Sequence, residues 1–228
     1  TGGIERLRIR SDGNVGVGSD NPQADFEVFG HSSSASGAAP ILAIRNGYSG
    51  TVDASNALKS EIRFLHKNHN AAHDFMAARI IADTTNNYSQ LTTLRFLVAN
   101  GNNGTERLTI DPAGRVYIGH TSNIAVGNQN PHVQLTGTTG GTAHLSIRNF
   151  SANTTGAILS LAKSRGSVGA YTAVQDDDVL GQINFAGADG TDLAEVAGKI
   201  TVACDATVAG NRVPSRMEFH TTDGNGNL

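Results

Sequence analysis

The stretch that decides the fold occurs twice in the chain. It reads ERLRIRSDGNVGVG from Glu5 to Gly18 and ERLTIDPAGRVYIG from Glu106 to Gly119, 101 residues later. In both strings, apolar residues alternate with other residues on either side of a turn sequence, which is the pattern of a β-hairpin with one apolar face. Repetition at this distance predicts an array of units that bury their apolar faces against one another, rather than a fold built around a single pocket.

The similarity continues in the same order along the chain. The spacing of matched positions grows to 123 residues, which indicates insertions between corresponding strands. The sequence therefore predicts two repeat units, 1–104 and 105–228. The matched pairs are Ile41–Asn46 (ILAIRN) with His144–Asn149 (HLSIRN), Ser60–Phe64 with Leu180–Phe185, Ile80 with Ile200, and Phe96 with Phe219.

The composition favours many short strands over helices. Of 228 residues, 38% are hydrophobic and only 5% aromatic, with no Trp, while the 27 glycines exceed the usual share of about 7%. A helix over Ala71–Ile81 is disfavoured because its apolar residues form no clean stripe. Beyond the two hairpins, strands are predicted at Phe26–Phe29, Ile41–Ile44, Glu61–Leu65, Arg79–Ala82, Leu94–Val98, Val133–Leu135, Leu145–Ile147, Ile158–Ala162, Gly181–Phe185, Lys199–Ala203 and Met217–Phe219, with a mobile surface loop inserted between Phe150 and Asp178.

Charge and cysteine content exclude several classes of protein. A net charge of −3 leaves no overall basic field, so we expect no nucleic-acid partner. No apolar run is long enough to cross a bilayer, and we expect no membrane insertion. The single cysteine, Cys204, cannot form a disulfide within the chain and is expected to be a buried thiol. The start of the chain has neither Met nor a signal-peptide pattern, which suggests an excised piece.

Strands this short and poor in aromatics make a weak monomer. Ordering each residue costs roughly 1–2 kcal/mol, and a thin core barely offsets that cost. Several identical chains laid side by side would cover the open strand edges and join their apolar faces in one axial core. Self-association is therefore expected, although this argument does not fix the number of chains.

Most of the chain resembles the shaft repeats of bacteriophage tail fibres and tailspikes. Beyond the two hairpin strings, the most specific part is Ala162 to Thr191, where KSRG (Lys163–Gly166), TAVQ (Thr172–Gln175) and GQINFAGADGT (Gly181–Thr191) follow in the order seen in that family. The resemblance implies an all-β, elongated repeat of short strands that forms a trimeric β-helix or β-prism-like fibre. Full-length members end in an intramolecular chaperone domain, which we expect this fragment to lack.

Two clusters of potential metal ligands favour a structural interpretation. His66, His69 and His73 could bind zinc, but Lys and Asn between them favour a solvated loop. The run Asp176–Asp178 could bind calcium or supply the paired carboxylates of a glycosidase, yet adjacent carboxylates repel each other, which favours a solvated loop tip. The same holds for Asp189, Asp192 and Glu195, where Asp189-Gly190 is expected to form a turn.

Three further patterns also yield no predicted site. The string SLAK at Ser160–Lys163 matches the S-x-x-K of penicillin-recognising enzymes, but the companion motifs are absent. Arg6, Arg8 and Arg10 could meet an anionic glycan, although Glu5 and Asp12 can pair with them. We therefore predict no catalytic, cofactor-binding or metal-binding residues. The tyrosines, which could stack on sugars but are scattered, are Tyr48, Tyr88, Tyr117 and Tyr171.

Three functions remain open at this stage. The leading hypothesis is a non-enzymatic structural protein of the virion tail, a homotrimeric fibre segment that contacts other tail proteins and contributes to host attachment through a surface glycan or receptor. The alternatives are a tailspike enzyme that degrades host surface polysaccharide, and a capsid-attached fibre or cellular adhesin of similar β architecture.

Overall fold

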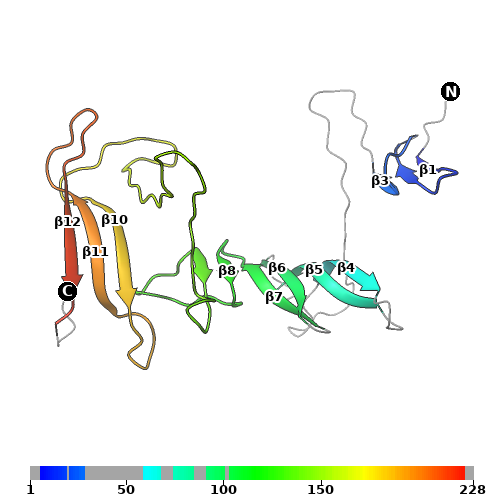
Figure 1. The fold of residues 1–228 in the computed structure, drawn as a ribbon, viewed down its shortest axis with the longest axis horizontal. Helices are drawn as coiled ribbons and strands as arrows, with labels where there is room; N and C mark the ends of the chain where they lie inside the picture. The colour runs from blue at the N-terminus through cyan, green and yellow to red at the C-terminus, as the bar shows by residue number, and fades with distance from the viewer. Residues whose placement is uncertain are drawn as a thin grey trace.

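The computed structural model describes residues 6–19, 21–28, 59–67, 74–84, 91–100 and 103–223. Every regular element in these ranges is a β-strand (Figure 1), so the predicted all-β class is confirmed. The segment Ala71–Ile81, where a helix was disfavoured, contributes to strand β5 (Asp74–Thr84). Among the described residues, no helix of the length and apolarity needed to span a bilayer is present.

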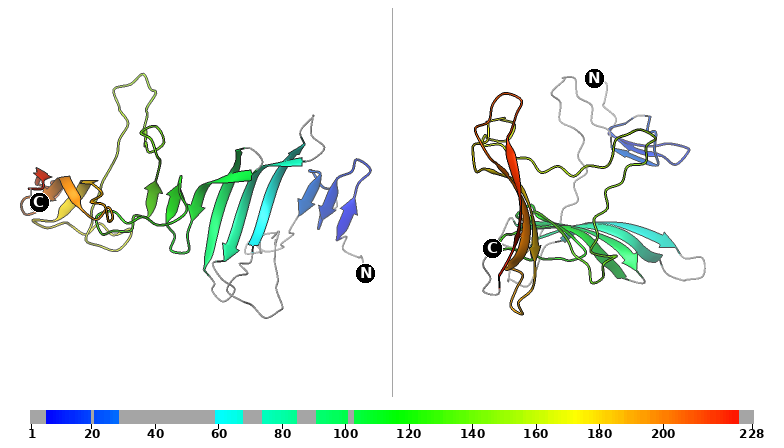
Figure 2. Two further views of the ribbon diagram at one scale, coloured as in Figure 1. Left: turned by 90° about the horizontal axis from the view of Figure 1, so that it is seen from below. Right: turned by 60° about the vertical axis from the view of Figure 1, so that its left-hand side comes forward.

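The strands form three sheets that follow one another along the long axis of the molecule (Figures 1 and 2). Within the described ranges, no strand of one sheet packs against a strand of another. Each sheet is therefore a single layer. The remaining strands are β1 (Leu7–Ile9), β2 (Val15–Val17), β3 (Phe26–Val28), β4 (Lys59–Lys67), β6 (Thr92–Asn100), β7 (Asn103–Ile110), β8 (Val116–Ile118), β9 (Val133–Leu135), β10 (Val179–Ala186), β11 (Val196–Cys204) and β12 (Ser215–Thr221).

The central sheet has six strands in the order β4-β5-β6-β7-β8-β9. Neighbouring strands are antiparallel from β4 to β8, and β9 runs parallel to β8. Strands β4 to β6 come from the first sequence unit and β8 and β9 from the second, and the junction at residues 104 and 105 lies within β7. The sequence repeat and the sheets are thus out of phase.

The two hairpin strings adopt the same backbone. In each, an antiparallel hairpin (β1-β2 or β7-β8) is followed by a parallel third strand (β3 or β9). Gly18 and Gly119 are the first residues after the two hairpins. Their φ angles are 74° and 86°, in the left-handed region that favours glycine. A Cβ on Gly119 would lie 2.1 Å from the carbonyl oxygen of Thr136, so the close approach of the next strand also requires glycine.

The remaining strands repeat as well. Sheet β10-β11-β12 has the same antiparallel order as β4-β5-β6. Its cross-strand row of Ile183, Ile200 and Phe219 corresponds to the row of Ile62, Ile80 and Phe96 in the central sheet. The residues matched in sequence thus occupy equivalent places in the structure.

Strand β9 is joined to β10 by residues 136–178, here called the arm, which extends away from the sheets (Figure 2). The strands predicted at Leu145–Ile147 and Ile158–Ala162 are wrong for the single chain, because neither segment pairs with a strand among the described residues. The strand predicted at Ile41–Ile44 lies outside the described residues. All the other predicted strands overlap observed ones.

The C-terminal end of the arm is held by contacts with the C-terminal sheet and by an ion pair within the arm, and Cys204 N of β11 donates to the carbonyl of Asp178 at 2.8 Å. A Cβ on Gly181 would lie 2.7 Å from the Cβ of Leu161, so Leu161 packs directly over this glycine. Arg165 donates two hydrogen bonds to the carboxylate of Asp178, from Nε at 2.6 Å and from Nη2 at 2.7 Å. The insertion predicted as a loop is therefore tied down at its C-terminal end.

Candidate functional site

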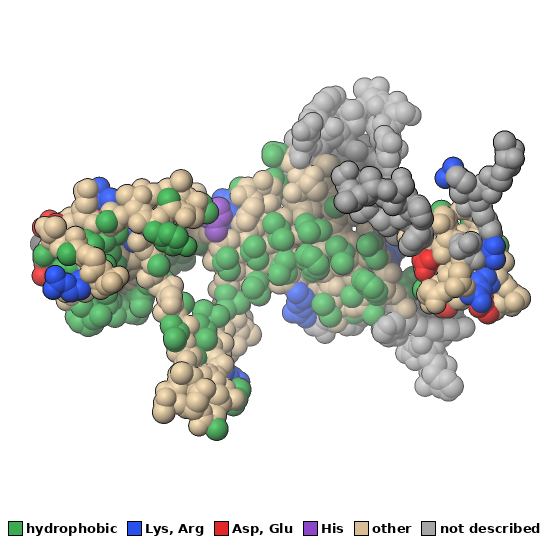
Figure 3. Space-filling model, turned by 90° about the horizontal axis from the view of Figure 1, so that it is seen from above, with side chains coloured by type: hydrophobic (Ala, Val, Ile, Leu, Met, Phe, Trp, Pro, Cys, Tyr) green, Lys and Arg blue, Asp and Glu red, His purple; other side chains and the backbone are tan. Residues whose placement is uncertain are grey.

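A continuous apolar row crosses one face of the central sheet. Strand register places one large apolar residue from each strand directly opposite the next. Figure 3 shows hydrophobic side chains gathered over this middle part of the molecule. Apolar side chains in neighbouring rows of the same face, such as Phe64 and Val98, are exposed too. The row consists of Ile62, Ile80, Phe96, Leu108, Ile118 and Leu135, of which the first and the last two are exposed.

The opposite face of the central sheet is polar and yet better buried. The row next to the apolar one contains Glu61, Ile81, Arg95, Thr109, Tyr117 and Gln134. Arg95 forms ion pairs with Asp83 and Glu106, the latter at 3.1 Å. Thr109 and Tyr117 are each 1% exposed. The isolated chain therefore covers its polar face and leaves its apolar face open, the reverse of what burial of apolar surface favours.

The C-terminal sheet has the same two faces. Its apolar face exposes Ile183, Phe185, Met217 and Phe219. Leu161 of the arm lies against this face and lines an apolar cavity together with residues of all three strands. On the polar face Thr201 and Ala203 are buried. Both large sheets thus present uncovered apolar surface.

A hydrogen-bonded cluster fixes the second hairpin. The carboxylate of Asp111 accepts bonds from the Tyr117 hydroxyl at 2.6 Å, from Arg115 Nε at 2.7 Å, and from the backbone amides of Ala113 and Arg115, each at 2.9 Å. Burial alone would raise the pKa of Asp111, but these donors outweigh it and lower the pKa to about 2. Burial and the bond to Asp111 raise the pKa of Tyr117.

The first hairpin reaches the same backbone with different side chains. Gly16 stands where the second copy has Tyr117, and a Cβ there would lie 3.2 Å from the ring of the buried Pro22. Arg10 stands where the second copy has Asp111, and its Nη1 donates to Asn21 Oδ1 at 2.7 Å. In the first hairpin, the Pro22 ring thus occupies the space above the strand that the Tyr117 ring fills in the second hairpin. Arg10 makes the polar contact in place of Asp111.

The histidine cluster lies mostly outside the described residues, so the expectation of a solvated loop stays a prediction. His66 lies in strand β4, while His69 and His73 fall outside the described residues. Within the described ranges, no group of three or more His, Cys, Asp or Glu side chains is placed to hold a metal ion.

In the acidic run, Asp176 and Asp177 are exposed residues of a turn, as predicted, whereas Asp178 is half-buried. Asp178 is held by Arg165, and this bond is the main reason that its pKa is lowered. The backbone of Asp177 and Asp178 bonds to Cys204, with Cys204 N donating to Asp178 O at 2.8 Å. The sequence suggested solvation of Asp178 because its partners, Arg165 and β11, lie far away in the chain.

Arg216 of β12 is a charged centre that the sequence did not reveal. Its guanidinium contacts Asp177 at 2.9 Å, Asp205 at 3.2 Å and Glu218 at 2.7 Å. The bond to Glu218 contributes most to its raised pKa, and the same bond is the main cause of the lowered pKa of Glu218. Only the alternation within β12, which places residues 216 and 218 on one face, gave a signal for this pairing.

Asp189, Asp192 and Glu195 are exposed, and the SLAK string lies in the part of the arm where the predicted strand does not form. Asp189 Oδ1 accepts backbone bonds from Thr191 at 2.7 Å and Asp192 at 3.2 Å, and Gly190 has φ of 101°, which confirms the turn. These bonds lower the pKa of Asp189. Lys163 Nζ donates to the carbonyl of Ser164 at 2.8 Å.

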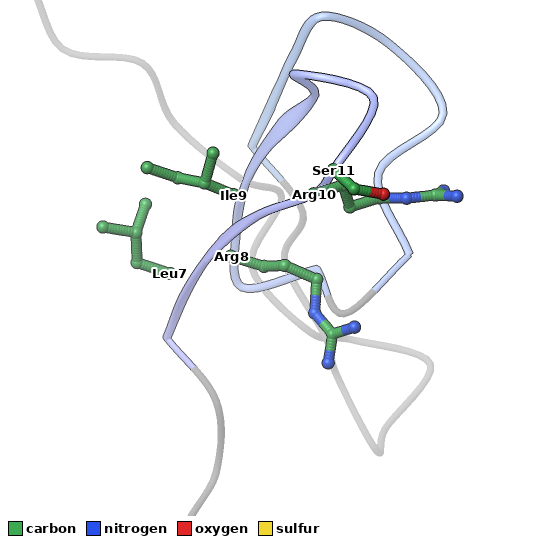
Figure 4. A pocket seen from close by; sticks show the side chains of 5 residues that line it. All are labelled: Leu7, Arg8, Ile9, Arg10 and Ser11. Atoms are coloured by element: carbon green, nitrogen blue, oxygen red, sulfur yellow. The ribbon is translucent and has the colours of Figure 1, made fainter.

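The arginines of β1 lie on the face opposite its apolar residues. Figure 4 shows Arg8 and Arg10 pointing away from Leu7 and Ile9 around a shallow surface hollow. Arg10 Nε lies 3.4 Å from Asp12 Oδ2, so this predicted pairing is confirmed.

The described tyrosines differ in burial. Tyr117 belongs to the Asp111 cluster, whereas Tyr171 is 96% exposed, and Tyr48 and Tyr88 lie outside the described residues. Cys204 is a free, fully buried thiol, as predicted, and its Sγ donates to the carbonyl of Ala206 at 3.2 Å.

These features define an all-β chain of serial, single-layer sheets. Its fold is similar to that of the carboxy-terminal domain of the bacteriophage T5 L-shaped tail fibre, with a TM-score of 0.61 and 14% identity over 87% of this chain and 83% of that one. A second structure of that domain, which includes its intramolecular chaperone domain, aligns with a TM-score of 0.54 and 13% identity over 88% of this chain and 58% of the other. The expected tail-fibre-like fold is thus confirmed. No protein-family model matches the chain, and a search of curated proteins gives no match.

Proposed function

We propose that this chain is a segment of a bacteriophage tail fibre and works as a homotrimer with a structural, non-enzymatic role. Its place is the virion tail, where it spans distance, contacts other tail proteins and contributes to host attachment. The observation that supports this most is the apolar row, which no described part of the chain covers. Joining these rows from sister chains creates the core that one chain lacks.

The arm supports the same proposal. Residues 144–164 form no backbone–backbone hydrogen bond in the structure, although all of them are described. They carry exposed apolar side chains, among them Phe150 at 92% exposure and Ile158 at 75%. An extended segment with this pattern gains a hydrogen-bond ladder and apolar cover when sister chains lie beside it.

The electrostatics favour a structural role over catalysis. A glycosidase needs a carboxylic acid whose pKa is raised, so that it can donate a proton. In the described part of the chain, the surroundings lower the pKa of five carboxyl groups, namely Glu27, Asp111, Asp178, Asp189 and Glu218. Hydrogen bonds from arginines, hydroxyls or backbone amides cause this lowering, so these groups stabilise turns and strands.

The two sequence units, 1–104 and 105–228, are proposed to be successive repeats of the shaft. The sheet that crosses their junction joins the last strands of one unit to the hairpin of the next. Tension along the fibre would therefore act on hydrogen-bonded strands instead of on a linker.

Light scattering after size exclusion tests the proposal. We expect three chains in one elongated particle, and a compact monomer would overturn the proposal. Phe64→Asn and Ile183→Asn, both at exposed apolar positions of the sheets, should weaken the trimer while circular dichroism keeps its strand signal. Val168→Asn is the matched control, because Val168 is a fully exposed arm residue away from the sheets. Equal trimer stability in all three variants would refute the role of the apolar faces.

A further inference from the structure

The outer edge of β12 repeats the edge at which β6 binds β7. Strand β12 is the last in the order β10-β11-β12, and no described strand pairs with its other side. Met217 and Phe219 lie 123 residues after Leu94 and Phe96 of β6, and they hold the same places relative to the shared apolar row. In the central sheet, Leu94 pairs with Ile110, and Phe96 pairs with Leu108.

The direction of the backbone N–H and C=O groups shows which residues of β12 face its open edge. Thr222 N donates to the carbonyl of Ala197, so residues at even positions of β12 face β11. Because the backbone groups of successive residues alternate in direction, Met217 and Phe219 present theirs to the open edge. The donors and acceptors of β12 are therefore spaced to take one more antiparallel strand.

The backbone groups at the contact between β6 and β7 alternate in the same way. Asp111 N donates to the carbonyl of Arg115, which turns Thr109 and Asp111 toward β8 and leaves Leu108 and Ile110 facing β6. Their partners, Leu94 and Phe96, therefore face β7. The open edge of β12 thus matches an edge that is filled elsewhere in this chain.

Strand β1 has the complementary edge. Arg10 N donates to the carbonyl of Asn14, and Gly18 N donates to the carbonyl of Arg6, so the even positions of β1 face β2. Leu7 and Ile9 consequently direct their backbone groups away from the hairpin, as Leu108 and Ile110 do in β7. The β1-β2 hairpin has the backbone that the β12 edge requires.

We propose that the edge of β12 binds β1 of a second copy of this chain, end to end, in the register of β6 and β7. Phe219 then lies opposite Leu7 of the second copy, and Met217 opposite Ile9. In the single chain these four side chains are 59% to 74% exposed, whereas none of Leu94, Phe96, Leu108 and Ile110 is exposed. Docking would half-bury the exposed set in the same way.

Charge is complementary across the same contact. The register of β6 and β7 places Arg95 opposite Thr109. The equivalent pair in the proposed joint is Glu218 opposite Arg8 of the second copy, which brings an acid next to a base. Opposite charges facing each other across two strands stabilise their pairing. The joint would turn two three-stranded sheets into one six-stranded sheet, and it does not depend on how many chains lie side by side.

The test is a tandem chain in which Glu5 of a second copy directly follows Leu228 of the first. This joint keeps the natural spacing, because Leu228 corresponds to Thr105, the residue before Glu106. Hydrogen exchange followed by mass spectrometry reports on the peptide that contains residues 215–221, which both copies yield in equal amount, so that the peptide of the first copy appears as the slower of two populations. We expect its outward-facing amides to exchange about tenfold more slowly than in the unfused chain, because each gains a ladder bond.

Met217→Pro in the first copy should abolish this slowing. The amide of Met217 faces the open edge, so proline there spares the bonds between β11 and β12. Val168→Pro is the matched control, since Val168 is the second residue of a turn closed by the bond from Ala170 N to Ser167 O, a place that proline favours. The control should keep the slow exchange.

Both chains are measured in dilute solution, where the unfused chain does not associate end to end. Two results would then overturn the inference: equal exchange in the fused and unfused chains, or slow exchange in the Met217→Pro tandem. The number of chains in the unfused particle is measured separately. A monomer whose β12 is protected only in the tandem would refute the trimer and support the joint, and an unprotected trimeric tandem would do the reverse.

Discussion

Removing the Tyr117 hydroxyl tests whether the Asp111 cluster stabilises the second hairpin. Tyr117→Phe keeps the buried ring and deletes one donor, the hydroxyl 2.6 Å from Asp111 Oδ2. The drop in the pKa of Asp111 from 3.8 to about 2 corresponds to about 2.5 kcal/mol of net stabilisation of the charged form, which is what its donors contribute after the opposing effect of burial. Three donors remain in the variant, so we expect a loss of about 1–1.5 kcal/mol in the free energy of unfolding.

The pH dependence gives this prediction its sign. Because the folded-state pKa of Asp111 is lowered, its contribution is complete above about pH 4 and is lost as the pH falls through about 2. Without the hydroxyl, the pKa of Asp111 moves back toward its ordinary value. The difference between wild type and variant should therefore be largest at neutral pH and shrink in acid.

Urea unfolding followed by circular dichroism measures both effects at one fixed protein concentration, since association would shift the apparent stability. Tyr171→Phe is the matched control, because Tyr171 is 96% exposed and forms no hydrogen bond in the structure. A loss in Tyr117→Phe no larger than in the control would refute the reasoning. So would a loss that stays constant between neutral pH and about pH 2.

Two further predictions concern glycines. Gly119→Ala should destabilise the chain by more than Gly114→Ala, because both glycines have positive φ but only a Cβ on Gly119 would meet the Thr136 carbonyl. Thermal unfolding of the two variants measures the difference, with a loss of about 1 kcal/mol expected for Gly114→Ala. Equal losses in the two variants would contradict the prediction. Gly181→Val should displace Leu161 from the C-terminal sheet and lower the free energy of unfolding by about 1–3 kcal/mol. Adding Leu161→Ala to this variant should recover part of that stability in the same assay. If the losses of the two single variants simply add, residues 161 and 181 do not contact each other.

The sequence predicted the parts of the fold that depend on neighbouring residues. Alternation in Leu7 and Ile9, followed by turn residues and a second alternating pair, was enough to predict the hairpin β1-β2. The matched Ile80 and Ile200 even occupy equivalent rows. These features could be predicted because strand period and turn conformation are local properties.

The strands predicted in the arm failed for a reason that is not local. The segments Leu145–Ile147 and Ile158–Ala162 have the alternation of a strand, but a strand also needs a neighbour for its backbone groups, and the chain supplies none there. The ion pairs of Arg216 and of Asp178 were missed for the same reason. The pairing of β10 to β12 brings Arg216 to Asp205, and the path of the arm brings Arg165 to Asp178. No short stretch of sequence encodes either contact.

A comparison of the two repeats indicates which part of their surface could make the same contact in every repeat. They have in common the turn glycines and one apolar residue per strand in each row, and they differ on the opposite face, where Arg10 and Gly16 replace Asp111 and Tyr117. Each version of that polar face is satisfied within its own hairpin. A contact that repeats along a rod needs the same surface in every repeat, and the apolar row is the surface that both repeats present. For this reason the contacts between chains that we propose involve that row, and the structural variation lies on the face turned away from it.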